Sequence, residues 1–543
     1  MNVWVRLAAA SLLVTLPITT ARAASGDPAD SLVAAPGPAA GAPIDAIEIE
    51  TRPIFDPAAG TLGGTVLSIA NRFHVRTRRS TVRSHLLFRE GDPWDPAVAD
   101  ETARNMRRLQ FLTPERIAAH TRGDSTVVRV ETRDLWSTLF DFNVERGGGQ
   151  TFGSFAFTER NMLGLGKELS IGYSEDPTGI SRSLYLFDPA VGGGRARLRV
   201  GGATGSDGAT NEFLAGLPFY AIEAPYTLLA EGARTTSVAR LFERGSEVAN
   251  FDRRVETLEF TGGFGVRRGD VVRRVTGSFL VYNRRLGPSS VLPGAPADFT
   301  GGEDNLRIRR LSVTLTLWRP DFVQRTFVEE MGPIEDFDIG QSAAIELGVA
   351  PAFLGGTADE AYARFALDAG ASLPIGFGRV RISTESRIRS TPLEIVRRLD
   401  ARWTTRWQPR HALVLSMLGI EGSRVPRDFQ VVFGALNGLR AYSVHALAGR
   451  RAWRFNAEDR WTLPSDVGGQ LRVGFAGFYD GARAWGPGSG GSEWFHSVGA
   501  GLRMSLPRLS PSQILRLDVA WPIVPTRDGR RDPVVSFGSR QAF

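Results

Sequence analysis

Two patterns of apolar and polar residues divide this chain. Over residues 44–134, apolar side chains recur at strand and helix spacing, in the order strand, helix, helix, strand, strand. Over residues 135–543, helical spacing disappears and apolar residues alternate with polar ones. Alternation puts apolar side chains on one face of a strand and polar side chains on the other. The chain is therefore predicted to contain a small α/β domain followed by an all-β domain.

The small domain carries helix and turn signals. Apolar residues at helical spacing predict a helix over residues 96–109. Ser80 and Thr81 are typical N-cap residues, so an earlier helix is expected to begin there. Residues 123–124 are Gly-Asp, which predicts the turn of a hairpin whose second strand includes residues 127–130.

The all-β region combines apolar faces with rows of arginine. Residues 311–317 alternate apolar and polar side chains, and residues 195–200 and 380–389 place their arginines on one face. A transmembrane barrel has this pattern because its outer face contacts lipid and its interior contacts water. A soluble two-sheet sandwich also alternates, but seldom over about 400 residues in one series. We therefore expect an all-β transmembrane barrel. Turn signals divide it into about 18 to 20 segments, some of which we expect to be halves of long strands.

The composition is compatible with such a barrel and indicates export. The chain is 42% hydrophobic and 23% charged, and no run of about 18 apolar residues follows the amino terminus, which argues against membrane-spanning helices. Arg6, the apolar run 7–18 and the small-x-small motif at 21–23 predict a signal peptide over residues 1–23. Residues 24–43 are rich in Ala, Pro and Gly and predict a flexible linker.

Several classes of function are disfavoured by the residues present. The chain has no cysteine, which excludes disulfides, thiolate metal sites and cysteine nucleophiles. The six histidines are scattered without a zinc-binding spacing, and there is no Gly-x-Ser-x-Gly motif. The formal charge of +7 comes from dispersed arginines rather than from a basic cluster, so we expect no nucleic-acid partner. We also expect no enzymatic activity, no metal and no cofactor.

One glycine-punctuated loop stands out in the all-β region. Residues 433–442 are mostly apolar, with Arg440 as their single cation. Strand parity in later segments points Glu458, Asp480 and Asp518 toward the barrel interior. A buried arginine is costly unless it is paired, so we expect Arg440 to bind one of these carboxylates. The alternative is a solvated Arg440 at the loop tip, with the carboxylates paired to interior arginines.

Motifs near the start of the mature chain resemble the BamA-like outer-membrane assembly superfamily (bacterial surface antigen family). Residues 77–112 are similar to a POTRA domain, the periplasmic module that precedes these barrels. Residues 161–167 resemble the family's Asn-x-Leu-Gly-x-Gly turn. The resemblance extends over residues 44–543 and implies a single POTRA domain followed by a barrel of about sixteen strands, at about 25 residues per strand and connection.

The glycine-punctuated loop carries the second part of the resemblance. Gly438, Leu439, Arg440, Ala441 and Tyr442 resemble the Val-Arg-Gly-Phe/Tyr motif of the family's sixth extracellular loop, with alanine in place of the motif glycine. In the family this loop folds back into the lumen, and its arginine contacts acidic residues on the late strands. The resemblance therefore implies the same placement for the loop of this chain.

The carboxy terminus resembles the signal by which outer-membrane barrels are recognised for insertion. Val535, Phe537 and Phe543 supply its apolar and terminal aromatic positions. Ser539 and Gln541 fit the apolar positions poorly, so we expect the last strand to pair weakly. In relatives, a weak seam between the first and last strands is the proposed lateral gate.

The resemblance implies a protein that inserts or translocates other proteins at the bacterial outer membrane, with the POTRA-like domain in the periplasm. Expected partners are unfolded outer-membrane or secreted proteins, which would add as strands at residues 127–130, together with outer-membrane lipids, lipopolysaccharide and periplasmic accessory proteins. A passive channel or structural surface barrel is a rival interpretation. Another is a two-partner-type transporter of one dedicated passenger, although such transporters carry two POTRA domains.

Overall fold

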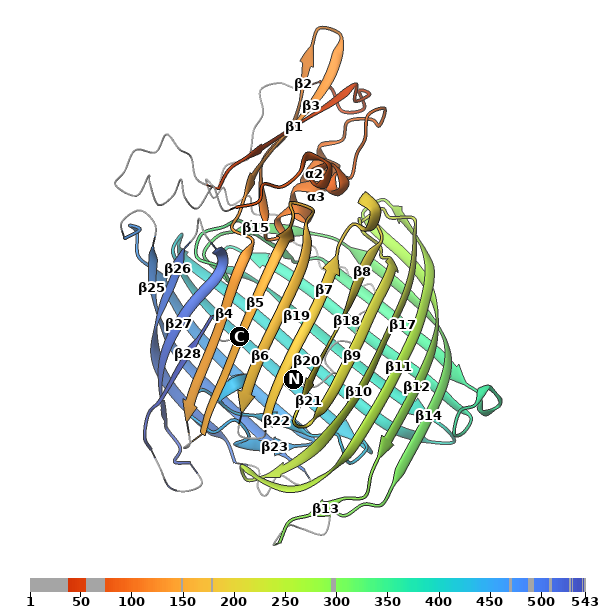
Figure 1. The fold of residues 1–543 in the computed structure, drawn as a ribbon, viewed down its shortest axis with the longest axis vertical. Helices are drawn as coiled ribbons and strands as arrows, with labels where there is room; N and C mark the ends of the chain where they lie inside the picture. Colours follow the sequence, from red (N-terminus) through yellow and green to blue (C-terminus); the bar gives the residue numbers. More distant parts are fainter. Residues whose placement is uncertain are drawn as a thin grey trace.

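The computed structural model contains a β-barrel with a small α/β domain at one end (Figure 1). It describes residues 38–54, 74–147, 150–176, 179–293, 299–467, 471–486, 493–506, 510–526, 529, 531–539 and 541. The predicted signal peptide, most of the linker and Phe543 lie outside the described residues. We call the barrel end beside the small domain the domain end, and the opposite end the far end. No helix within the described ranges is long and apolar enough to cross a membrane.

The small domain has a three-stranded sheet and two helices in the predicted order. Its elements are β1 (Ala46–Arg52), α2 (Arg79–His85), α3 (Pro96–Arg107), β2 (Leu112–Arg122) and β3 (Ser125–Asp134). β3 lies in the centre of the sheet, parallel to β1 and antiparallel to β2. The prediction that clients add at residues 127–130 is therefore wrong, because β3 is already paired on both sides. The outer strands of this sheet are β1 and β2.

Of the two predicted helix starts, the first is wrong and the second is confirmed. α2 begins at Arg79, so Ser80 and Thr81 lie inside the helix and do not cap it. The hydroxyl of Thr81 instead donates to the carbonyl of Gly164 in the barrel (2.8 Å). α3 begins as predicted at Pro96, and its first turn is capped by a preceding aspartate.

Twenty strands close the barrel among the described residues, each antiparallel to its neighbours. They are β4 (Thr138–Gly147), β5 (Gln150–Met162), β6 (Lys167–Asp176), β7 (Gly179–Asp188), β8 (Arg197–Gly205), β9 (Gly208–Leu217), β10 (Tyr226–Glu243), β11 (Ser246–Arg268), β12 (Val271–Leu286), β14 (Asp304–Arg319), β17 (Gln341–Ala350), β18 (Glu360–Leu373), β19 (Gly376–Ile388), β20 (Pro392–Gln408), β21 (His411–Ser423), β24 (Arg451–Thr462), β25 (Arg472–Trp485), β26 (Phe495–Leu506), β27 (Ser510–Pro522) and β28 (Val534–Gly538).

The expectation of about sixteen strands is wrong. A strand and its connection take about 20 residues rather than about 25, because several hairpins, such as β10–β11 and β11–β12, turn within two residues. The loop expected as the family's sixth connects β21 to β24 and is here the eighth far-end connection. Counted from the carboxy terminus, this loop is the third far-end connection both in a barrel of sixteen strands and in this barrel of twenty described strands. The four additional strands therefore precede the loop in the sequence.

Short elements lie in the connections. They are β13 (Ser290–Val291), β15 (Phe322–Arg325), β16 (Glu335–Asp338), β22 (Val431–Phe433), β23 (Leu447–Gly449) and the single-turn helices η2 (Val191–Gly193), η4 (Ala352–Leu354) and η5 (Ala435–Asn437). β22 and β23 pair with each other, as do β15 and β16. Figure 1 shows β15 beside the small domain.

The outer face of the barrel is apolar as the alternation predicts. Leu228, Phe260, Val275, Leu311 and Leu347 all lie on outward-facing positions and are about half exposed or more. The residues between them point inward, where charged side chains pair with one another. This arrangement explains why the whole chain has an ordinary soluble-like composition.

Candidate functional site

The loop of residues 424–450 is shaped by two of its glycines. A Cβ on Gly434 would lie 2.0 Å from the Ser443 carbonyl oxygen, so the loop folds back on itself only with glycine there. Gly438 has a φ of +96°, and a Cβ on it would lie 2.6 Å from the Arg454 side chain on the barrel wall. These two positions are the tight points of the loop.

Ala441, the one departure from the family motif, fits its position. Its side chain is 1% exposed and packs in a cluster with Leu439 and Tyr442. It is not among the residues with a positive φ, so its backbone does not require glycine. The close backbone approach that the motif glycine would permit is supplied here by Gly434 and Gly438.

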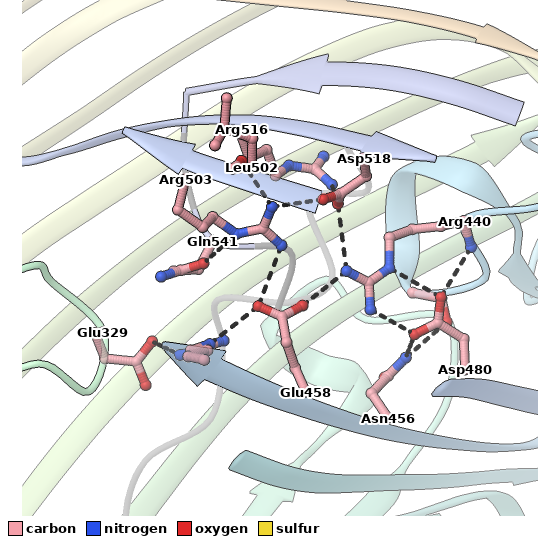
Figure 2. Close-up of polar contacts among 12 residues, drawn as sticks. Glu329, Arg440, Asn456, Glu458, Asp480, Leu502, Arg503, Arg516, Asp518 and Gln541 are labelled. Carbon is pink, nitrogen blue, oxygen red and sulfur yellow. Dashed lines mark hydrogen bonds and ion pairs between the residues drawn. The ribbon is translucent and has the colours of Figure 1, made fainter. Parts of the chain in front are cut away.

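Arg440 contacts all three carboxylates that strand parity directed inward (Figure 2). Its Nε and Nη2 donate to the two oxygens of Asp480 at 2.9 and 2.8 Å, a bidentate pair. Its Nη1 donates to Glu458 at 2.7 Å and to Asp518 at 3.3 Å. The guanidinium also lies 3.3 Å from the centre of the Phe478 ring. Because Arg440 is 2% exposed, the alternative of a solvated loop tip is wrong.

The same carboxylates also bind arginines of the barrel wall. Arg503 donates to Asp518 (2.5 Å) and to Glu458 (3.3 Å). Arg516 donates to Asp518 (2.9 Å), and Arg460 donates to Glu458 (3.0 Å). The carboxylates lie on β24, β25 and β27, and Arg503 lies on β26, so the cluster ties the loop to four consecutive late strands of the barrel.

Polar and aromatic groups extend the contact of the loop with this wall. The Tyr442 hydroxyl lies within hydrogen-bond distance of the carbonyl oxygens of His496 (2.7 Å) and Val524 (2.8 Å). Its ring packs edge-on against Phe495, with 5.1 Å between the ring centres. Asn456 donates to the carbonyl of Gly438 (2.9 Å), which fixes the backbone before Arg440.

The loop also contacts the opposite wall of the barrel. Gln430 exchanges two hydrogen bonds with the backbone of Phe242 on β10, at 2.9 and 2.6 Å. The His445 ring stacks on the Phe242 ring with 3.8 Å between the centres. Asp428 accepts a hydrogen bond from Arg253 on β11 (2.9 Å). The loop therefore crosses the lumen between the β10–β11 wall and the late-strand wall.

A second constellation, absent from the sequence prediction, is the hairpin formed by β15 and β16. We call residues 320–340 the domain-end hairpin. Its Val328 is 1% exposed, and the Val328 carbonyl accepts from Arg460 of the barrel wall (2.7 Å). The Met331 carbonyl accepts from Arg472 (2.5 Å). The signal in the sequence is a charged, glycine- and proline-containing interruption between two alternating segments, and such an interruption does not by itself distinguish an interior hairpin from an exposed loop.

The domain-end hairpin connects the site to the small domain. Arg107 of α3 binds Asp336 of the hairpin through two hydrogen bonds of 2.6 and 2.7 Å. At the other end, Arg460 lies 3.7 Å from Glu329 of the hairpin and also binds Glu458. Since Glu458 binds Arg440, a series of charged contacts extends from the loop to Glu329 of the hairpin (Figure 2), and the hairpin in turn is bound to the small domain through Asp336.

The small domain also docks directly on the barrel. The turn at 161–167 has two glycines with positive φ, and a Cβ on Gly164 or Gly166 would overlap small-domain atoms at 2.4 and 2.8 Å. Arg195, in the β7–β8 connection, donates to the carbonyl of Ser84 at the end of α2 (2.9 Å). Burial and the positive charge of Arg195 lower the pKa of His85 to about 4, so this imidazole is neutral.

The closure between the last and first strands is short. β28 pairs with β4 at three residue pairs among the described residues, including Phe537 with Val144, whereas β4 and β5 share ten. After Gly538 the chain turns inward. The Ser539 hydroxyl donates to Asp141 (2.5 Å), and the Gln541 side chain accepts from Arg503 of the site. This inward turn explains why Ser539 and Gln541 do not fit an apolar outward pattern.

The comparisons with known proteins find similar folds at low identity. No protein-family model and no curated protein matches the chain. Matching solved structures include CdiB from Acinetobacter baumannii, at 12% identity and a TM-score of 0.44, covering 92% of this chain and 73% of that chain. CdiB from Escherichia coli matches at 10% and 0.45, covering 94% and 92%. BamA from Haemophilus ducreyi lacking POTRA domains 1–3 matches at 14% and 0.36, covering 91% and 84%. At these identities and TM-scores we transfer no function from these proteins.

Proposed function

We propose that this protein inserts or translocates other proteins at the bacterial outer membrane. The small domain would act as a POTRA-like domain in the periplasm, and the barrel would rearrange without catalytic chemistry or a cofactor. The observation that carries the proposal is that β28 and β4 close the barrel through only three residue pairs among the described residues. The late strands next to this closure are held together by Arg440. A passive channel needs neither a short closure nor a loop anchored across its lumen.

Separate roles follow for the late strands and for the closure beside them. The contacts of Arg440 would hold β24, β25 and β27 in a fixed arrangement. The closure would open instead, because β28 pairs with β4 at only three residue pairs among the described residues. Opening there would expose the edge of β4, and an exposed edge strand pairs readily with another chain. Unfolded outer-membrane proteins are clients of this kind, because their own strands need a partner edge.

The small domain would receive clients on its outer strands. Because β3 is central, a client in extended form would add to β1 or β2. The docking of α2 and α3 on the barrel places this sheet at the domain end, where a client would arrive from the periplasm.

A disulfide across the closure tests the proposal, because the chain has no native cysteine. Val144→Cys with Phe537→Cys would join two directly paired positions of β4 and β28. A matched control is Ile171→Cys with Leu184→Cys, an outward pair on β6 and β7 away from the closure. The purified chains are reconstituted in vesicles and given a urea-unfolded eight-stranded outer-membrane barrel as client.

Insertion is measured as the fraction of client protein that becomes resistant to added protease. We expect the oxidised closure pair to lose insertion and to regain it with reductant, while the control pair inserts client in both states. Normal insertion by the oxidised closure pair would overturn the proposal. Passage of a secreted passenger through the locked barrel would instead favour a dedicated transporter that uses the lumen.

A further inference from the structure

The outer face of β11, β12 and β14 changes from apolar to basic toward the far end. On β14, Leu311 is 49% exposed, and the next two outward positions toward the far end are Arg309 and Arg307. On the neighbouring strands, Arg285 of β12 is paired in register with Arg254 of β11. The residues between these positions along each strand point inward and include buried side chains. The four arginines therefore share one outward surface, which we call the outer arginine patch.

The outer arginine patch lines a groove. The groove has a volume of about 930 Å³, and all four arginines contribute to its lining. The β8–β9 turn (Ser206 to Gly208) forms part of its edge. The strands here are long, 18 residues in β10 and 23 in β11, so the groove lies beyond the apolar band rather than within it.

Three arginines of the patch have no acidic partner among the described residues. Arg254 binds Glu256 (2.5 Å), and Arg309 donates to the carbonyl of Ile308 on its own strand (2.9 Å). In the part of the chain that the structure describes, no carboxylate lies within ion-pair distance of Arg285, Arg307 or Arg309. These three charges therefore face the groove without an ion pair, while Asp207, Asp252 and Glu303 also contribute to its lining.

Two outward arginines elsewhere on the same rim share one carboxylate. On β20 and β24, Arg397 and Arg451 both bind Glu421 of the strand between them, at 3.0 and 3.2 Å. Exposed arginine by itself is therefore not what distinguishes the patch. The difference is that three of its four arginines have no carboxylate within ion-pair distance among the described residues and line a groove.

We propose that the outer arginine patch binds the phosphate groups of a lipid head group in the membrane leaflet at the far end. The guanidinium groups match phosphate oxygens in a bidentate geometry, and arginines near an anionic membrane surface strengthen lipid binding. The acyl chains of the same lipid would pack on the apolar band that begins at Leu311. A free phosphate would gain nothing from that band, so the site favours a lipid-borne phosphate.

The orientation of the proposed function identifies the lipid more closely. With the small domain in the periplasm, the far end lies in the cell-surface leaflet, and this assignment rests on that orientation. The phosphorylated lipid of that leaflet is lipopolysaccharide. Lipid binding is measured on the protein alone, without a client, so its failure would leave the closure test unaffected.

The test is a binding titration of the purified full chain in detergent micelles. Rough lipopolysaccharide, the same lipid after removal of its phosphates, and inorganic phosphate are the three probes. The variant is Arg285→Gln with Arg307→Gln, and the matched control is Arg397→Gln with Arg451→Gln on the same rim. Heat-dependent migration on gels checks that both double variants remain folded barrels.

We expect the Arg285→Gln, Arg307→Gln variant to bind rough lipopolysaccharide about 30-fold more weakly than the wild type. The control variant should bind as the wild type does, and the dephosphorylated lipid should bind the wild type as weakly as the double variant binds the intact lipid. Equal affinity of the double variant and the wild type would overturn the proposal. So would equal binding of the dephosphorylated lipid, or displacement of the lipid by inorganic phosphate at matching concentration.

Discussion

Arg440 belongs to a buried cluster of charges in which every member has several partners. Glu458, Asp480 and Asp518 are completely buried, and together they bind the loop arginine and three arginines of the wall. Burying charges is costly, and the cost is offset only while each charge keeps its partners. The cluster therefore favours one position of the loop, because displacing Arg440 would leave buried carboxylates with fewer cations.

Removing one charge from this cluster should destabilise the barrel. We expect Asp480→Asn to lower the free energy of unfolding by about 3–5 kcal/mol, because Arg440 loses its bidentate partner and stays buried. The midpoint of heat-dependent migration on gels measures the change. Asp400→Asn is the control, since Asp400 is half exposed and lies 3.5 Å from Arg398, a type of pair worth about 0–1 kcal/mol. Equal shifts in the two variants would show that the cluster does not stabilise the fold.

At the scale of single residues, the sequence predicts which carboxylates face Arg440 but not how the loop that carries Arg440 is folded. A period of two along a strand is sufficient to place Glu458, Asp480 and Asp518 on the inner face, without any knowledge of the barrel. The role of Gly434 and Gly438 could not be predicted, because it depends on which atoms the folded loop approaches. For the same reason, the sequence does not show that alanine fits at position 441, where the family motif has glycine.

At the scale of elements, local patterns predict strands but do not determine their pairing. Alternation identifies the barrel. The turn signals indicate about 18 to 20 segments, but interpreting some of them as halves of long strands leads to sixteen strands, and the barrel has twenty among the described residues. The domain-end hairpin was missed because its short strands have no long alternation, and its contacts with Arg460 and Arg107 are distant in sequence. The central position of β3 likewise depends on a parallel pairing with β1, which no local signal encodes.

The domain-end hairpin should respond to pH through Glu335. This carboxyl accepts from the backbone amides of Val328 (2.9 Å) and Glu329 (2.8 Å). Burial, reinforced by the charges of Glu329 and Glu330, raises the pKa of Glu335 to about 8. Because the pKa is raised from 4.5, the docked hairpin favours the neutral acid, and its stability is complete below about pH 4.5 and is lost as the pH rises through about 8.

Hydrogen exchange at the Val328 and Glu329 amides measures this response. After correction for intrinsic exchange rates, we expect protection to be lower at pH 9 than at pH 6. Glu335→Gln keeps a neutral side chain at both values, so its protection should not change with pH. A pH response that persists in this variant would assign the effect to another group.

At the scale of the whole molecule, two segments from opposite ends of the barrel occupy its interior. The loop of residues 424–450 crosses the lumen in the far half, and the domain-end hairpin contacts the wall arginines from the other side. Both meet at Glu458 and Arg460, which bind each other. An interior arranged in this way differs from that of a wide passive pore, whose wall charges face water.

Planar-bilayer recording separates these interpretations. We expect the wild-type barrel to conduct weakly, because the anchored loop and the domain-end hairpin both lie in the ion path. Arg440→Ala should raise the current and make it fluctuate, since the loop loses its contacts with Glu458, Asp480 and Asp518 while the hairpin remains. Arg398→Ala removes an arginine that is 37% exposed and does not hold the loop, so its current should match that of the wild type. A wide and steady wild-type pore that Arg440→Ala leaves unchanged would contradict the anchored-loop mechanism and favour a passive channel.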